Sequence, residues 1–293
     1  MDAKPSPFSK AFVAFYVFVH RQLHLRGAGF ILRCVARVLP GLRNFPLEMK
    51  AVGTAVVDFR ETSAYSLLNY SLGERGSDWS LLSAIACVLK PGDVFWDVGA
   101  NIGYISQHFA QPRFRVGEIH AFEPNPMVRK TLETLFERHP RVRIHPVALG
   151  EQDMQREIHV CPHSSAEGSL VRDVPGATPI SIEVRRADTY RIENRLPAPN
   201  VVKIDVEGFE PQVLAGMQKT IFETRPIVFF EHIWISEEAI RKCIPEGYEI
   251  VYLLDDGTLT ANTAVRLRGA NAVLVPREKA ALLPACVARE GAC

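Results

Sequence analysis

The stretch VFWDVGANIGYIS, residues 94–106, decides the fold of this chain. Its apolar start, Val94-Phe95-Trp96, ends at the acidic Asp97, and a glycine-containing turn then leads into a segment with a helical pattern. A strand, a tight turn and a helix start in this order are typical of an α/β protein with a parallel sheet. Glycine allows positive φ and a close approach to the backbone, and a helix N-terminus offers free N–H groups. We therefore expect a ligand site at this turn.

The glycine spacing of this turn argues against a dinucleotide site. The dinucleotide fingerprint is G-x-G-x-x-G, whereas here three residues separate Gly99 from Gly103. A nucleotide-dependent oxidoreductase is therefore disfavoured.

Three further apolar segments end in charged residues. EIHAF (118–122) is followed by EPN (123–125), KIDVEGFE occupies residues 203–210, and PIVFF (226–230) is followed by EH (231–232). In this order and at these separations, DVGANIGY, AFEPNP, KIDVEGFE and FFEH resemble the FkbM family of methyltransferases, which use S-adenosylmethionine (SAM). The resemblance covers residues 78–275, and KIDVEGFE is its most family-specific piece.

The resemblance implies a class I methyltransferase fold. This α/β, Rossmann-like fold has a seven-stranded, mostly parallel sheet with helices on both faces. The resemblance also implies SAM as cofactor and, as acceptor, a hydroxyl of a sugar, glycan or other secondary metabolite. The alternative is a protein of the same fold that binds SAM without catalysis and docks on a partner through its basic N-terminus.

The composition sets limits on compartment and partners. The chain has 293 residues, of which 47% are hydrophobic and 23% charged, as expected for a globular protein with a sizeable core. Residues 78–275 carry no basic patch interleaved with aromatics, so a nucleic-acid substrate is not expected. The six cysteines are scattered and show no metal-ligand spacing, which favours a reducing cytoplasm.

The N-terminal part is more basic than the rest. Residues 1–50 hold eight Lys/Arg and two Asp/Glu, so they carry +6 and the remainder −5. We expect a basic amphipathic helical extension over residues 1–46 and a methyltransferase domain over 47–293. The apolar run 11–19 is too short for a membrane span, which takes about 20 residues.

This extension has two interpretations. Phe8, Phe12, Phe15 and Val19 share one helical face. Either the extension packs on the domain as a pair of helices, or residues 8–43 rest on anionic lipid or on a protein partner as a peripheral element.

Strand-like and helix-like segments alternate from residue 93 onward. We expect strands near 93–97, 117–122, 142–147, 201–205, 226–231, 248–254 and 271–275, and helices near 103–110, 126–138, 211–222 and 236–243. Ahead of them we expect a hairpin over 47–60 that turns at Gly53, and a helix from Trp79 to about Leu89 with Asp78 as N-cap.

The alternation breaks between residues 151 and 186. Residues 156–160 and 180–185 alternate like an antiparallel pair. The segment between them, residues 161–179, is polar and rich in Ser, Gly and Pro. We interpret it as an inserted loop, because loops of this length in a compact domain are often lids or recognition segments.

Candidate cofactor residues lie at strand ends, where open parallel sheets bind ligands. The resemblance implies that Asp97 holds the SAM ammonium, directly or through water. Glu123 suits the ribose diol, since a carboxylate accepts two hydrogen bonds; its alternative role is a charge ahead of the helix that starts near Pro126. Further cofactor contacts are expected from Gly99, Ala100, Asn101, Gly103, Pro124 and Ala148.

Candidate catalytic residues follow the next two strands. Methyl transfer to an alcohol requires in-line alignment and removal of a proton. His232, with an ordinary pKa near 6.5, is the candidate base, and Glu231 precedes it. Asp205 would position the acceptor or His232, or itself act as the base.

The acids of KIDVEGFE leave alternatives open. Glu207 is either catalytic or a favourable charge at the N-terminus of the next helix, and for Glu210 the helix role is preferred. Asp205 and Glu207 are the candidate ligands if a divalent cation is needed, although no recognised metal motif is present. Lys203 beside Asp205 suggests a buried ion pair.

Overall fold

The computed structural model describes the backbone at Pro7, Ala11, 14–16, Phe18, 34–42, 45–49, 53–60, Ala64, Leu67, Leu68, 78–161, 164–169 and 178–283. Within these residues, no helix combines the length and the hydropathy needed to cross a membrane.

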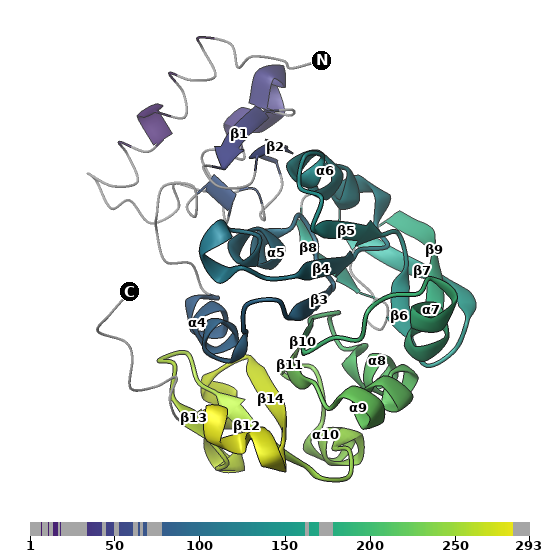
Figure 1. Cartoon of the computed structure of the whole chain (residues 1–293). Coiled ribbons are helices and arrows are strands. Elements are labelled where there is room, and N and C mark those ends of the chain that lie inside the picture. The colour runs from purple at the N-terminus through teal and green to yellow at the C-terminus, as the bar shows by residue number, and fades with distance from the viewer. Residues whose placement is uncertain are drawn as a thin grey trace.

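A central sheet organises the described structure (Figure 1). Its strands are β3 (Val94–Val98), β4 (Glu118–Phe122), β5 (Val142–His145), β10 (Val201–Ile204), β11 (Ile227–Glu231), β12 (Tyr248–Leu253), β13 (Leu259–Thr260) and β14 (Asn271–Pro276). They lie in the order β13-β12-β14-β11-β10-β3-β4-β5. The five from β11 to β5 are parallel, while β14 is antiparallel to both of its neighbours. All seven expected strands are present, and the two-residue β13 adds an edge. This is the α/β fold of class I methyltransferases.

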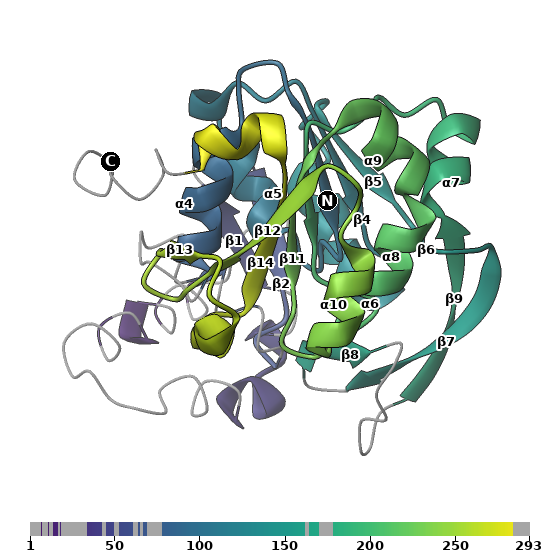
Figure 2. The same ribbon diagram turned by 90° about the horizontal axis from the view of Figure 1, so that it is seen from below.

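Helices cover both faces of this sheet. They are α4 (Trp79–Val88), α5 (Tyr104–Phe109), α6 (Pro126–Phe136), α7 (Ala187–Glu193), α8 (Glu210–Gly216), α9 (Gln218–Thr224) and α10 (Glu237–Cys243), with short 3-10 turns η1 (Pro40–Leu42), η2 (Pro112–Phe114), η3 (Thr263–Arg268) and η4 (Arg277–Leu282). Figure 2 shows α4 and α5 on one side and α8, α9 and α10 on the other.

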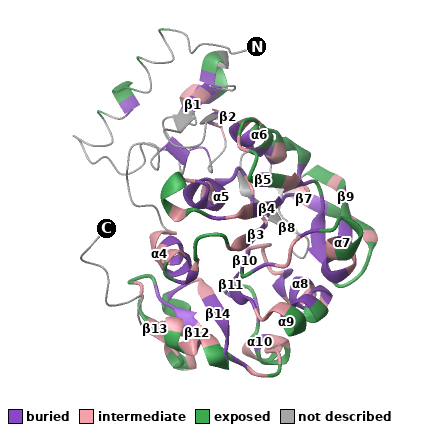
Figure 3. Ribbon diagram, viewed as in Figure 1, coloured by how far each residue is buried: buried purple, intermediate pink, exposed green. Residues whose placement is uncertain are grey.

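Two hydrophobic cores result from strand alternation. Neighbouring strand residues point to opposite faces, so Phe95 packs with Phe109 of α5, whereas Trp96 lies in the core that includes Val213 of α8. Figure 3 shows buried residues along the central strands and on the inner sides of the helices. The strand tips are thereby held between two packed layers.

The helix expected over 211–222 is two helices, α8 and α9, that meet at Met217. A Cβ on Gly216 would lie 1.7 Å from the Gly150 carbonyl oxygen, so α8 ends where its backbone touches another strand. At the start of α4, Asp78 occupies the N-cap position as expected, but its side chain makes no capping hydrogen bond.

A second sheet interrupts the alternation, where β6 (Ala148–Gly150), β7 (Met154–Cys161), β8 (Ser164–Ser169) and β9 (Thr178–Arg186) lie in the order β6-β9-β7-β8. The expected antiparallel pair is confirmed as β7 and β9. The segment 161–179 is not loop throughout, because β8 pairs with β7 inside it. Backbone hydrogen bonds to a free strand edge need no apolar side chains, so the polar SSAEGS gave no strand signal.

The expected hairpin is present as β1 (Phe45–Met49) and β2 (Gly53–Val57), but Gly53, the expected turn residue, is the first residue of the second strand and pairs with Met49. It packs on α6, where Thr131 Oγ1 donates to the Val56 carbonyl at 2.9 Å.

Only part of the N-terminal extension is described. Tyr16 and Ala36 are buried in the core, whereas Phe15 and Phe18 are 61% and 56% exposed. Phe8, Phe12 and Val19, the rest of the expected apolar face, lie outside the described residues.

Candidate functional site

The carboxyl ends of four parallel strands meet at one edge of the sheet. The strand order reverses at β3, since β4 and β10 flank it and the chain continues outward from each. Such a switch point is where open α/β sheets bind ligands. Asp97 is the last but one residue of β3, Glu231 ends β11, and Glu123 and Asp205 directly follow their strands. The topology thus brings the four predicted acids to one edge.

Asp97 is fully buried in an ion-pair network. Its Oδ2 accepts a hydrogen bond from Ser106 Oγ at 2.6 Å, and its Oδ1 lies 3.3 Å from Lys203 Nζ. The same ammonium donates to the Gly99 carbonyl at 2.8 Å and lies 3.5 Å from Asp205 Oδ2. Burial alone lowers the pKa of Lys203, but the carboxylates of Asp205 and Asp97 raise it above its ordinary value. Lys203 therefore stays charged and ties the ends of β3 and β10 together.

Glu123 is held by backbone groups from two loops. Its Oε2 accepts from the Asn101 N–H and its Oε1 from the Asn125 N–H, both at 2.8 Å. Burial raises the pKa of this carboxyl to about 7, although the two hydrogen bonds oppose the shift. The side chain that caps α6 is that of Asn125, which accepts from the Met127 N–H. The alternative role of Glu123 at that helix is therefore filled by its neighbour.

The turn after β3 satisfies its own N–H groups. Gly99 and Ala100 both donate to the Phe122 carbonyl at 3.0 Å, and Gly103 donates to that of Ala100. The N–H of Asn101 also has a partner, Glu123. All four of these N–H groups are therefore engaged within the protein, and the expected contact of this turn with a cofactor would come from its other groups.

The glycines of this turn allow the protein to pack on itself. Gly99 and Gly103 have φ of 75° and 86°, and a Cβ there would lie 1.9 Å from the Asp205 carbonyl oxygen and 2.6 Å from Leu132 Cδ1. From the sequence, we expect the backbone of this turn to be open to a ligand. Instead, the space beside Gly99 is filled by the loop after β10, which approaches β3 closely.

The other two predicted cofactor residues lie further along. Pro124 follows Glu123, and its carbonyl accepts from Arg129 Nη1 at 3.1 Å. Ala148 is buried and opens β6, opposite Val184 of β9.

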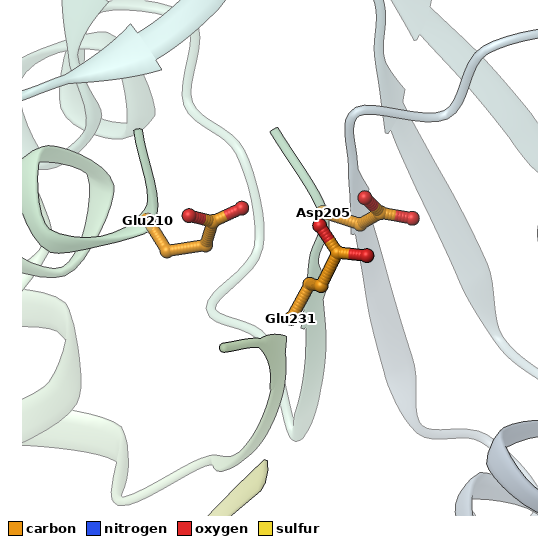
Figure 4. Close-up of side chains that lie close together, drawn as sticks. All are labelled: Asp205, Glu210 and Glu231. Carbon is orange, nitrogen blue, oxygen red and sulfur yellow. The ribbon is translucent and has the colours of Figure 1, made fainter. Parts of the chain in front are cut away.

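Three carboxyl groups converge beside this network (Figure 4). Asp205 follows β10, Glu210 begins α8 and Glu231 ends β11, and each offers an oxygen within 4.8 Å of the other two. Glu210 Oε1 accepts from the N–H groups of Val206 and Gly208 at 2.9 and 3.3 Å. Glu210 Oε2 and Glu231 Oε2 are buried without a hydrogen-bond partner in the described part of the chain.

For Glu210 the sequence favours the role of a charge at the helix N-terminus. Glu210 does begin α8. However, the chain reverses at Glu207 and Gly208, which have positive φ of 56° and 101°, and this reversal places Glu210 near Asp205. The D-x-E-G-x-E spacing holds that signal, because the glycine permits the reversal. Glu207, which was expected beside Asp205 as a candidate cation ligand, is not one of the three acids that meet here.

Burial, and then the neighbouring charges, raise the pKa values of two carboxyls in this cluster. Burial raises the pKa of Glu210 to about 7. Burial, with the charges of Asp205 and Glu207, raises that of Glu231 to about 9. Carboxylates this close together cannot all be ionised without a counter-charge.

His232 lies in a different environment from that expected of a base. It is fully buried, with its ring edge-on to Tyr252 at 5.2 Å and its Nδ1 3.1 Å from Arg266 Nη1. Since a guanidinium only donates, Nδ1 is the acceptor and the ring proton lies on Nε2. Burial and then Arg266 lower the pKa of His232 to about 4. In this tautomer Nε2 is a buried donor without a hydrogen-bond partner among the described residues, and His232 is not one of the three acids of the carboxyl cluster.

The family assignment follows from a comparison with known domains. Residues 97–256, more than half of the chain, match the profile of the methyltransferase FkbM domain. The chain belongs to this family. The matched region begins at Asp97 and includes Glu123, the carboxyl cluster and His232.

Two relatives each match about half of this chain. The hexuronic acid methyltransferase AglP of Haloferax volcanii is 30% identical over 156 residues, which are 53% of this chain and 62% of AglP. The 2-O-methyltransferase NoeI of Sinorhizobium fredii is 26% identical over 158 residues, covering 48% of this chain and 64% of NoeI. The chain thus spans less than two thirds of the length of either relative.

A solved structure of methyltransferase FkbM from Methylobacillus flagellatus is 18% identical, with a TM-score of 0.43 over 73% of this chain and 56% of the other.

Proposed function

We propose that this chain is a SAM-dependent methyltransferase that methylates a hydroxyl oxygen of a sugar, a glycan or another secondary metabolite. The observation that carries the proposal is the edge of the FkbM domain where Glu123 and the Asp97–Lys203 pair meet the carboxyl cluster. The names of the relatives, a hexuronic acid methyltransferase and a 2-O-methyltransferase, support a sugar-like acceptor.

The residues at β3 and β4 fit SAM. Each Glu123 oxygen accepts one backbone N–H, and a carboxylate has about four acceptor positions. Two therefore remain for the ribose diol. Asp97 is fully buried against Lys203 and Ser106, so we assign it a positioning role for the turn 99–103 rather than a direct contact with the SAM ammonium. Bound SAM would supply an electrophilic methyl group.

The proton of the acceptor hydroxyl goes to the carboxylates after β10 in this proposal. Asp205 is 43% exposed at its side chain, and Glu207 is half-buried in the same loop. His232, whose Nε2 carries the proton, is assigned a structural role. A positive φ at a non-glycine residue such as Glu207 stores strain, and such strain often accompanies function.

The proposal is tested by titrating the full chain with SAM, and with NAD as control, in a calorimeter, then by measuring S-adenosylhomocysteine release over a panel of sugars, glycans and other hydroxylated metabolites. Saturable binding of SAM but not NAD, with turnover on an acceptor, is expected. Failure to bind SAM would refute the assignment. Binding without turnover on any acceptor would favour the non-catalytic alternative.

The base assignment is tested by kcat and SAM affinity in His232→Ala, Asp205→Asn and Glu207→Gln. We expect kcat to fall about 10²–10⁴-fold, the usual span of general-base catalysis, in one of the two carboxylate variants. SAM affinity should stay nearly unchanged. A fall of that size in His232→Ala alone would restore His232 as the base.

A peripheral contact through residues 8–43 is a second proposal. Phe15, Phe18 and Val38 are all more than half exposed, as expected of an apolar face that lacks cover from the domain. Co-sedimentation of the full chain with vesicles should require anionic lipid and fall with salt. Equal recovery with neutral and anionic vesicles would refute a lipid contact.

A further inference from the structure

The carboxyl cluster contains acceptor atoms that the described protein leaves unsatisfied. Glu210 is fully buried, yet its Oε2 has no hydrogen-bond partner among the residues described, and the same holds for the buried Oε2 of Glu231. Burying a polar group without a partner costs about 1–3 kcal/mol and more for a charge. Figure 4 shows the three carboxyl groups near one another, and two unsatisfied acceptor atoms in such a group indicate a missing partner.

Lys203 is the cation that the described part of the chain places against the cluster, and its charge is shared. Lys203 lies 3.5 Å from Asp205 Oδ2, but the same ammonium pairs with buried Asp97 at 3.3 Å and donates to Gly99. Its single charge is thus shared with a carboxylate outside the cluster. Three acids that meet within 4.8 Å therefore keep an excess of negative charge when ionised.

The geometry of the ligand atoms defines what the partner is. Asp205, Glu210 and Glu231 come from two strand ends and one helix start, so packing of three elements fixes their backbones. They offer oxygen atoms alone, the ligands that Mg²⁺, Mn²⁺ and Ca²⁺ prefer over softer metals. We propose that Asp205, Glu210 and Glu231 bind one divalent cation of this hard class.

The cation would activate the acceptor hydroxyl for methyl transfer, a role that rests on the proposed function. Three protein ligands leave coordination positions open on a six-coordinate ion. An acceptor hydroxyl bound there would become more acidic, because a metal ion lowers the pKa of a coordinated O–H group. The partly exposed side chain of Asp205 places this site toward solvent, where an acceptor would enter.

Metal binding is measured without reference to activity. The full chain is treated with chelator, dialysed and titrated with Mn²⁺, and the free Mn²⁺ signal is followed by electron paramagnetic resonance. We expect one Mn²⁺ per chain, displaced by Mg²⁺ or Ca²⁺. Glu210→Gln and Glu231→Gln should each weaken Mn²⁺ binding by about tenfold or more, since affinity follows the number of charged ligands. Glu210→Gln retains an oxygen for the two backbone N–H groups, and circular dichroism confirms folding.

The matched control is Glu238→Gln. Glu238 is exposed on α10 and pairs with Lys242 at 2.7 Å, so its variant should bind Mn²⁺ like the wild type. Two results would overturn the site. One is a free Mn²⁺ signal that the protein does not reduce even at millimolar metal, and the other is equal Mn²⁺ affinity in the wild type and both cluster variants. Calorimetric SAM binding on the same samples separates the two proposals: intact SAM binding without Mn²⁺ binding refutes the cation alone, and the reverse refutes the cofactor assignment alone.

Discussion

Glu123 and Glu231 occupy equivalent places on the two sides of the switch point, yet their surroundings differ. Both lie at the end of a parallel strand, and burial raises the pKa of both. Each oxygen of Glu123 accepts a backbone N–H, whereas Glu231 Oε2 has no such partner in the described structure. Glu123 is therefore held by the chain itself, while in our proposal a bound cation completes the β10–β11 side.

Loop direction explains the difference. The turn after β3 carries positive φ at Asn101, which directs its N–H to Glu123. The turn after β10 directs the N–H groups of Val206 and Gly208 to Glu210 instead, and Glu231 Oε2 has no hydrogen-bond partner among the described residues. These two turns would make the β3–β4 side, which we call the cofactor half, rigid. The β10–β11 side, the acceptor half, would be completed only when a ligand binds.

The largest effect is expected where the two halves are joined. Lys203→Met removes the buried ammonium and leaves Asp97 charged and unpaired, so unfolding free energy should fall by about 3–5 kcal/mol. Lys219→Met is the control, because Lys219 is exposed and lies 3.8 Å from Glu223; surface pairs contribute about 0–1 kcal/mol. Urea denaturation measures both. Equal losses would mean that the network does not join the halves.

The close approach of the two loops is tested by a pair of glycines. Gly99→Ala places a Cβ 1.9 Å from the Asp205 carbonyl oxygen, whereas Gly92 has a similar φ, 88°, with nothing within 4 Å. Gly92→Ala should lose about 1–2 kcal/mol from backbone strain, and Gly99→Ala about 1–3 kcal/mol more from overpacking. Denaturation gives stability, and calorimetry shows whether Gly99→Ala also loses SAM. Similar losses at both positions would contradict the packing argument.

The cofactor half is tested by Glu123→Ala. Losing hydrogen bonds to a charged group costs about 1.5–3 kcal/mol, so SAM affinity should fall about 10- to 150-fold. Glu137→Ala, at the exposed C-cap of α6, should bind SAM normally. Calorimetry on the folded variants decides, and unchanged affinity in Glu123→Ala would remove Glu123 from the cofactor site.

The smallest effect is a slope with pH. Burial raises the pKa of Glu123 from an ordinary 4.5 to about 7, so between these pH values the folded state binds more protons than the unfolded state. Its contribution to stability therefore falls as pH rises through this window, by at most about 1.4 kcal/mol per pH unit. Glu123→Gln should lack this fall.

The control for the pH experiment is to compare the wild type with Glu123→Gln at each pH. Buried His108, His120 and His145 have lowered pKa values and change stability with the opposite sign, equally in both proteins. The unfolding free energy of the wild type minus that of Glu123→Gln should thus fall from pH 4.5 to 7. The charges of Lys203 and Arg129 oppose the upward shift of the Glu123 pKa. A flat difference would show that Glu123 titrates normally.

The sequence by itself determined the sheet and the position of its acids. Apolar runs that end in Asp97, Glu123 and Glu231 predicted strands with carboxyl groups at one edge, because hydrophobic patterning and the rule for parallel sheets are local or topological properties. The polar strand β8 and the break at Met217 escaped, since a free strand edge and a close backbone contact leave no periodic signal.

Only the tertiary structure decided which side chains work together. His232 and Glu231 are adjacent in sequence, but Arg266, 34 residues away, fixes the tautomer of the first. Glu210 joins the cluster through a backbone reversal at Glu207 and Gly208, and Gly99 faces Asp205 rather than open space. Hydrogen-bond direction, burial and loop reversal depend on residues distant in the chain, so spacing within a motif could not reveal them.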